Sequence, residues 1–252
     1  MIQVIKIGGG ILENETSREL FLRQFASVEG PKVLVHGGGR LATTMAERLG
    51  VKTQMIDGRR VTDKETLDIV TMVYGGLVNK QLVASLQAMG INAIGLTGAD
   101  GGWMKAVKRP VKNGIDYGFV GDVTEVNGAL LRSLVDSGLT PVIAPITFCQ
   151  EGVLLNTNAD TIASETAISL APEVQLTFCF EKAGVLRDAE NESSLIPRIT
   201  RESYSQLLAD GIVSGGMIPK IDNAFAALQK GVQSVRITHA NNLQGGTIIE
   251  ER

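Results

Sequence analysis

Ile5-Lys6-Ile7-Gly8-Gly9-Gly10 closes the first apolar run of the chain with a lysine and three glycines. A second short, β-branched run, Lys32 to His36, ends in the same way, with Gly37-Gly38-Gly39. Helical spacing of apolar residues follows each run, over residues 17–25 and 41–49. Strands that alternate with helices in this way predict an α/β fold built on a parallel sheet.

The same alternation continues along the chain, with one interruption. A long helical pattern from Asp63 to Met89 precedes a strand at Ile91 to Leu96, and Trp103 to Glu125 is typical of antiparallel hairpins on one edge of the sheet. The pattern then predicts these elements: a helix over 128–137, a strand over 141–144, a hairpin return over 153–155, a helix over 159–170, a strand over 174–180, helices over 202–210 and 219–230, and strands over 234–238 and 247–250. A lobe boundary is expected near residue 172.

The composition of the chain argues against several classes of function. The 252 residues are 44% hydrophobic, and 24 Lys and Arg against 27 Asp and Glu give a net charge of −3, without the basic excess that nucleic-acid binding favours. The two cysteines, Cys149 and Cys179, lie in apolar runs typical of buried thiols and indicate neither a disulfide framework nor a metal site. Neither a signal peptide nor an apolar stretch of membrane-spanning length is expected, which predicts a cytoplasmic protein with no membrane partner.

Glycine turns at strand ends are candidate phosphate sites. Lys6 immediately precedes Gly8 to Gly10, so an ammonium and exposed backbone N–H groups converge there. The carboxyl ends of neighbouring parallel strands meet at one edge, where α/β sheets bind ligands, and this places Gly37 to Gly39 beside them. A solvated lysine at a glycine turn is the alternative for Lys6. His36 could act as an acid or base, but a lone histidine at a strand end is more often structural.

Three further motifs carry polar groups suited to ligands. Arg60 could hold a carboxylate bidentately, or form a surface pair. Asn156, Asn158 and Asp160 share one turn into a helix, where capping explains one or another of them but not all three. Lys220 follows a proline that suits a helix start, its alternative explanation. Two lysines beside glycine turns, one aspartate and no Cys/His cluster predict electrostatic phosphoryl transfer.

Taken together, these motifs resemble the amino acid kinase family. The likeness rests on residues 5–9, 35–39, 58–62, 156–160 and 215–220, in the same order and at comparable spacing from residue 2 to about 250. It implies an open, mainly parallel eight-stranded sheet between helix layers. An N-terminal lobe, 1–172, would bind an acylated glutamate and dimerise, and a C-terminal lobe, 173–252, would bind ATP. The implied activity is ATP-dependent phosphorylation of the side-chain carboxylate of N-acetylglutamate, or another N-acylglutamate, in arginine biosynthesis.

The resemblance also implies roles for single residues. Lys6 and Lys220 would stabilise the transferring phosphoryl group, and Asp160 would hold both lysines. Gly8, Gly9 and Gly38 would bind phosphate. The acylated glutamate would be bound by Gly38, Gly39, Arg60, Asn156 and Asn158, and the nucleotide by Glu181, Gly184, Ile212, Ser214 and Lys220. ATP with Mg²⁺ is expected, without a metal site of the protein's own. The nucleophilic carboxylate, with an ordinary pKa of about 4.3, needs no general base.

One segment departs from the family pattern. Where the family has Thr/Ser-Asp-Val-x-Gly, this chain has Phe180-Glu181-Lys182-Ala183-Gly184. Glu181 keeps an acid and Gly184 keeps the turn, so Mg-ATP binding is still expected, with altered nucleotide contacts. Arginine-inhibited members carry an extra N-terminal helix that links dimers into hexamers, whereas the first strand here begins at Ile2. An arginine-insensitive homodimer is therefore expected.

Two other functions stay open at this point. One is a different kinase of the same fold, acting on aspartate, glutamate, carbamate or a nucleoside monophosphate, against which Arg60 and Asn156 argue. The other is a non-catalytic ligand sensor that has lost ATP turnover through the altered 180–184 segment. Retention of both lysines and Asp160 argues against a sensor.

Overall fold

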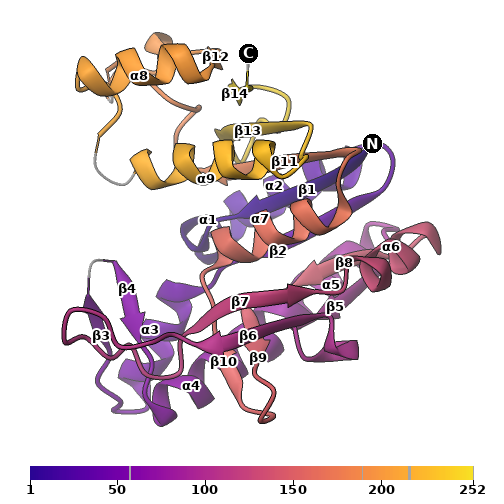
Figure 1. Cartoon of the computed structure of the whole chain (residues 1–252). Coiled ribbons are helices and arrows are strands. Elements are labelled where there is room, and N and C mark those ends of the chain that lie inside the picture. The colour runs from indigo at the N-terminus through magenta and orange to yellow at the C-terminus, as the bar shows by residue number, and fades with distance from the viewer. Residues whose placement is uncertain (57, 189, 215–216, 252) are drawn as a thin grey trace.

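A mixed, mainly parallel sheet of eight strands runs through the molecule in a computed structural model that describes residues 1–56, 58–188, 190–214 and 217–251. β13 and β14 are antiparallel, and the other neighbouring strands pair in parallel. In spatial order the strands are β12 (Arg198–Ile199), β14 (Thr247–Ile249), β13 (Ser234–His239), β11 (Val174–Phe180), β1 (Ile2–Ile7), β2 (Lys32–His36), β8 (Thr140–Ile143) and β5 (Ala93–Leu96) (Figure 1). The predicted eight-stranded sheet is confirmed.

The central strands are buried on both faces, which explains their nearly continuous apolar runs. β1 lies between β11 and β2, with Ile7 opposite Cys179 on one side and His36 on the other. The chain therefore leaves β1, β2 and β11 at the same edge of the sheet. Both cysteines are free and buried, as expected, and burial raises the pKa of the Cys179 thiol to about 12.

Helices cover both faces and complete three layers. One core, with Val4, Val35 and Phe178 from the sheet, contains residues of α6 (Gly128–Asp136), α7 (Ala159–Leu170), α8 (Arg201–Ala209) and α9 (Ile218–Gln229). The opposite core, with Ile5 and Leu34, contains residues of α1 (Gly9–Glu13), α2 (Glu15–Ser27), α3 (Gly39–Arg48), α4 (Lys64–Val70), η1 (Thr71–Val78) and α5 (Asn79–Ala88). Two 3₁₀ turns, η2 (Asp100–Gly102) and η3 (Glu192–Ser194), lie in connections.

The predicted hairpins form, but they do not extend an edge of the main sheet. β6 (Met104–Lys108) and β7 (Gly121–Val126) pair antiparallel, as expected. They join β9 (Ile146–Phe148) and β10 (Leu154–Asn156) in a separate four-stranded sheet, because β6 pairs with β9 at Lys105 and Phe148. A third sheet, not predicted from the sequence, is the hairpin of β3 (Gln54–Ile56) and β4 (Arg59–Val61).

The long helical pattern is one continuous helix from residue 64 to 88, with the π-helical segment η1 between α4 and α5. By length and composition alone it could cross a membrane, which the sequence was not expected to allow. Its most apolar window is 44% buried, and Val70, Val73 and Leu82 belong to the second core. It is therefore a core helix of the N-terminal part.

Candidate active site

The two glycine turns contact each other at the carboxyl edge of the main sheet. A Cβ atom on Gly9 would lie 3.5 Å from the backbone nitrogens of both Gly38 and Gly39. A Cβ on Gly38 would lie 2.9 Å from Cδ1 of Tyr74, whose ring is placed by the π-helical segment. Backbone alone thus fills the space between the two turns, as a glycine at each of these positions allows.

Lys6 and Asp160 form an ion pair between β1 and the first turn of α7. Lys6 Nζ lies 2.7 Å from Asp160 Oδ1. Lys6 lies within strand β1 and is only 7% exposed, although its side chain carries an ammonium group. Asp160 Oδ1 has no hydrogen-bond partner among the described residues, so this contact is an ion pair without the alignment of a hydrogen bond. The predicted contact between these two residues is present.

Lys220, in the first turn of α9, has its ammonium group beside the same Phe180 ring as Lys6. Its Nζ is 3.5 Å from the centroid of the Phe180 ring, and Lys6 Nζ is 5.3 Å from that centroid. The one aromatic ring of Phe180 therefore attracts both ammonium groups through cation–π interaction. Burial lowers the pKa of Lys220, as does the positive charge of Lys6, while Asp160 opposes the shift. Two like charges are held together by one carboxylate and one ring.

Arg60 presents an unused donor to the site. It lies on β4 and is only 8% exposed. Its Nη2 donates to the carbonyl oxygen of Gly39 at 2.8 Å and to Thr43 Oγ1 at 2.8 Å. Its Nη1 is buried and has no partner among the described residues. A buried guanidinium nitrogen without an acceptor is costly unless a ligand supplies one, and a carboxylate would do so.

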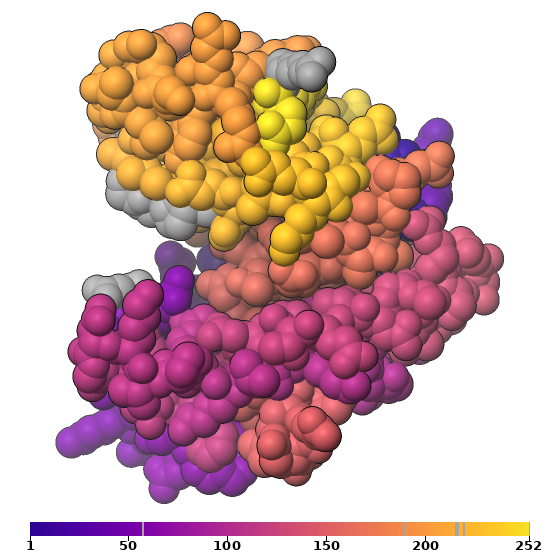
Figure 2. Space-filling model, in the orientation of Figure 1, coloured from indigo at the N-terminus to yellow at the C-terminus, as the bar shows by residue number. Residues whose placement is uncertain are grey.

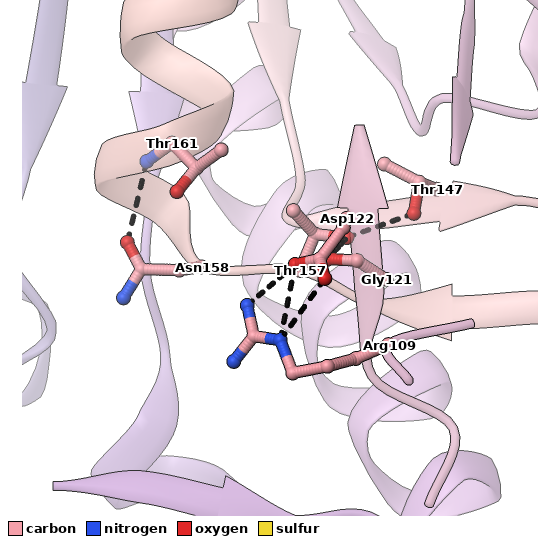
Figure 3. Close-up of polar contacts among 7 residues, drawn as sticks. All are labelled: Arg109, Gly121, Asp122, Thr147, Thr157, Asn158 and Thr161. Atoms are coloured by element: carbon pink, nitrogen blue, oxygen red, sulfur yellow. Dashed lines mark hydrogen bonds and ion pairs between the residues drawn. The ribbon is translucent and has the colours of Figure 1, made fainter. Parts of the chain in front are cut away.

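The asparagines of the 156–160 turn have different surroundings. Asn156 Nδ2 donates to Thr62 Oγ1 at 3.0 Å, which ties β10 to the end of β4. Asn158 caps α7, and its Oδ1 accepts from the backbone nitrogen of Thr161 at 3.3 Å (Figure 3). The same oxygen accepts from the backbone nitrogen of Asp160 at 2.8 Å. The cap accounts for the Asn158 oxygen, so any contact of Asn158 with substrate would use its amide nitrogen.

A cavity of about 450 Å³ is lined by residues of the second glycine turn, β4, the 156–160 turn and α9, whereas Lys6 and Gly9 are not among its lining residues. It lies where the surface is hollowed between the N-terminal and C-terminal parts (Figure 2). Predicted site residues that line it are Gly38, Gly39, Arg60, Asn156, Asn158, Asp160 and Lys220. A larger cavity, about 650 Å³, lies on the four-stranded sheet around Cys149 and shares none of these residues, so size alone does not select the site.

Sequence reasoning did not assign a role to several residues that line the 450 Å³ cavity, among them Arg59, Tyr74 and Arg109. Tyr74 was visible only as an apolar position of a helix, and burial raises the pKa of its hydroxyl. Arg59 could have been suspected from its position beside Arg60. Arg109 follows a strand of the four-stranded sheet, and its sequence neighbours give no indication of a site.

A further cavity, about 330 Å³, shares Lys220 with the 450 Å³ cavity. Gly8, Gly10, Phe180, Glu181 and Gly184 line it with Lys220, whereas Ile212 and Ser214 are not among its lining residues. Ile212 packs against the first core. Gly215 and Gly216 lie outside the described residues. Nucleotide contacts of Ile212 and Ser214 therefore stay predictions.

His36 has a structural role. It is fully buried, its Nδ1 lies 2.8 Å from the Gly37 carbonyl oxygen, and its Nε2 lies 3.1 Å from Asn79 Nδ2. Burial lowers the pKa of His36 to about 4, so the neutral ring joins β2 to α5. Its ring is occupied by these contacts, as expected for a structural histidine.

Comparison with known proteins places this arrangement in a family. Residues 1–239 match the amino acid kinase family. The chain belongs to the amino acid kinase family. Each motif that carried the resemblance in the sequence contributes at least one lining residue to these two cavities, and Gly215 and Gly216 lie outside the described residues.

The chain is also similar to individual proteins over nearly its whole length. It is 54% identical over 254 residues to the acetylglutamate kinase of Phocaeicola vulgatus, covering 99% of this chain and 98% of that protein. It is 55% identical over 245 residues to the acetylglutamate kinase of Bacteroides thetaiotaomicron, covering 96% and 95%. The crystal structure of smu.665 from Streptococcus mutans superposes with a TM-score of 0.82 at 29% identity, covering 100% and 99% of the two chains.

Proposed function

We propose that this chain transfers the γ-phosphoryl group of ATP to the side-chain carboxylate of N-acetylglutamate, in arginine biosynthesis. The names of relatives at 54% and 55% identity over nearly the whole chain support the substrate. The observation that carries the proposal is Lys220, which lines both the 450 Å³ and the 330 Å³ cavity. A phosphoryl group that passes from one cavity to the other would pass this ammonium.

In this proposal Arg60 fixes the acceptor. Its free Nη1 binds the α-carboxylate, which leaves the side-chain carboxylate to extend toward Lys6 and Lys220. That carboxylate is ionised at neutral pH because its ordinary pKa is about 4.3, so it attacks phosphorus without a general base. The contribution of Arg60 is orientation, which converts a bimolecular encounter into a positioned one.

The two lysines stabilise the charge that spreads over the transferring group. Lys6, Lys220 and the backbone N–H groups of the glycine turns are fixed before the reaction, as electrostatic stabilisation of a transition state requires. Asp160 lies 2.7 Å from Lys6 and holds it in place, and its charge favours the ammonium form of Lys220. A bond forms between an oxygen of the acceptor carboxylate and the γ-phosphorus, as the bond between the γ-phosphorus and the bridging oxygen of ADP breaks.

Mg²⁺ would enter with the nucleotide. The described residues contain no group of three or more His, Cys, Asp or Glu side chains suited to a metal ion. Glu181 lines the 330 Å³ cavity and is the acid available there. We propose that the ion is held mainly by the phosphates, where it would neutralise charge.

We further propose the lobe roles implied by the resemblance, with 1–172 binding the acylated glutamate and 173–252 binding ATP. A cytoplasmic homodimer insensitive to arginine completes the proposal. Met72 and Leu77, on the helix of residues 64–88, are 54% and 43% exposed, and large exposed apolar residues of one element suit a contact between copies. Light scattering of the wild type and of Met72→Glu with Leu77→Glu tests the dimer, and a monomeric wild type contradicts it.

A substrate panel tests the function. ADP release is measured with N-acetylglutamate, glutamate, aspartate, carbamate and a nucleoside monophosphate, with and without arginine. N-acetylglutamate should be the best of these, with no effect of arginine. Glutamate or aspartate as the better substrate would favour another kinase of this fold, and no ADP release with any acceptor would favour a ligand sensor.

A further inference from the structure

The peptide unit that links Gly37 and Gly38 is the part of the second glycine turn that backbone hydrogen bonds do not orient. The Gly37 N–H donates to the Ile7 carbonyl oxygen at 3.2 Å, and the Gly38 carbonyl oxygen accepts from the Ala42 N–H at 2.9 Å. Between these two bonds, a peptide flanked by glycines can turn over at little steric cost. Its orientation therefore depends on the contacts of its own carbonyl oxygen and N–H.

The buried His36 ring holds one side of this peptide, because its Nδ1 lies 2.8 Å from the Gly37 carbonyl oxygen. The N–H of the same peptide belongs to Gly38, which lines the 450 Å³ cavity, and this N–H has no acceptor among the described residues. The peptide is trans, so its C=O and N–H point in opposite directions. A carbonyl directed at His36 leaves the Gly38 N–H directed away from the ring and free for a ligand.

The side chains behind His36 determine which ring nitrogen carries the proton. The Lys80 ammonium can only donate, so Asn79 Oδ1, 3.1 Å away, accepts. Asn79 Nδ2 then donates to the Val142 carbonyl oxygen at 2.9 Å and to His36 Nε2 at 3.1 Å. Because Nε2 of the neutral ring accepts, the proton lies on Nδ1 and is donated to the Gly37 carbonyl oxygen. The polarity of the whole chain of hydrogen bonds is thus fixed.

We propose that His36 is a positioning residue for phosphoryl transfer, because through the Gly37 carbonyl it fixes the peptide whose Gly38 N–H binds the transferring group. This inference rests on the proposed function, which supplies the phosphoryl group. A donor fixed before the reaction stabilises developing charge without reorganisation. Without the His36 bond, the peptide is free to turn its carbonyl oxygen toward the phosphoryl group, which repels that group.

Two substitutions of His36 separate this role from packing. In His36→Asn the amide nitrogen takes the position of Nδ1 and keeps the donor, whereas in His36→Gln the amide takes the position of Nε2 and the donor to Gly37 is lost. In ADP release with N-acetylglutamate, kcat should fall about 10- to 100-fold in His36→Gln and stay within about threefold of the wild type in His36→Asn, since loss of a whole transition-state donor costs about 10²- to 10³-fold. KM for N-acetylglutamate should change less than kcat.

Trp103→Phe is the matched structural control. Trp103 is fully buried, its Nε1 donates to the Thr97 carbonyl oxygen at 2.7 Å, and it lines neither the 450 Å³ nor the 330 Å³ cavity. The substitution should lower the unfolding temperature and leave kcat nearly unchanged.

A spectroscopic measurement on the wild type needs no substitution. The chain has two histidines, and NMR of protein with ¹⁵N-labelled histidine reports which ring nitrogen carries the proton. At about pH 8, above the ordinary histidine pKa of about 6.5, the proton of His36 should be on Nδ1. His239 is the internal reference with the opposite arrangement, because its Nδ1 accepts from the Asn241 N–H at 3.1 Å.

The outcomes separate this inference from the proposed function. A His36 proton on Nε2, an unchanged kcat in folded His36→Gln, or an equal loss of kcat in both His36 variants overturns the positioning role. So does a loss in Trp103→Phe as large as that in His36→Gln, because kcat would then follow stability alone. If His36→Gln does not fold, kcat of His36→Asn and the tautomer in the wild type decide. Wild-type protein that releases no ADP with any acceptor overturns the proposed function instead.

Discussion

Replacing Arg60 by glutamine removes the buried guanidinium nitrogen to which the account assigns the α-carboxylate. Hydrogen bonds to charged groups contribute about 1.5–3 kcal/mol each, so KM for N-acetylglutamate should rise about 10- to 150-fold. Arg60 Nη2 also donates to the carbonyl oxygen of Gly39 at 2.8 Å. Without this bond the glycine turn of residues 37–39 should become less ordered, and kcat should fall several-fold as well. KM for ATP should change little, since Arg60 does not line the 330 Å³ cavity.

The assay is steady-state ADP release with each substrate varied in turn, on protein whose thermal unfolding has been checked. Thr43→Val is the matched control, because it removes the other Nη2 acceptor, 2.8 Å away, without removing the guanidinium. It should raise KM for N-acetylglutamate by less than about tenfold, the cost of one ordinary hydrogen bond. A folded Arg60→Gln variant with unchanged KM for N-acetylglutamate would refute the assignment of Arg60.

Further predictions follow from the lysines, the aromatic ring and the buried histidine. Lys6→Ala and Lys220→Ala should each lower kcat about 10²- to 10³-fold with a small change in KM for the acceptor; a loss confined to KM would contradict their role. Activity should decline at alkaline pH as the Lys220 ammonium is lost, starting below its ordinary pKa of 10.5 because burial lowers that pKa. Phe180→Leu should move this decline to lower pH and Phe180→Tyr should restore it, since the ring favours the charged form; coincident pH profiles would show that the ring only packs. His36, with its pKa lowered from 6.5 to about 4, stays neutral in the folded state, so the free energy of unfolding should fall by about 3 kcal/mol from above pH 6.5 to below pH 4, and urea titrations of His36→Gln should lack that component.

The sequence was sufficient for the elements whose signal is local. Buried parallel strands such as β1 and β11 appear as continuous apolar runs, and α7 begins and ends where its cap and periodicity predict. Lys6 and Asp160 could be paired in advance because the family resemblance relates them across more than 150 residues. Spacing alone would have left Lys6 as a strand lysine beside glycines.

Elements that depend on tertiary contacts could not be predicted. β3 and β4 are three residues each, too short for an apolar–polar alternation to be recognised, yet this hairpin presents Arg60. The π-helical segment that places Tyr74 against Gly38 has the same apolar spacing as an ordinary helix. Phe180 departs from the family motif in sequence, and only its position shows that its ring faces both lysines.

The central claim is that phosphate reaches the side-chain carboxylate of an acylated glutamate, and trapping the product with hydroxylamine tests it most directly. The enzyme, Mg-ATP and N-acetylglutamate should yield hydroxamate and ADP in equal amounts, and Lys220→Ala should yield little of either. ADP release without hydroxamate, or hydroxamate from Lys220→Ala at the wild-type rate, would contradict the account.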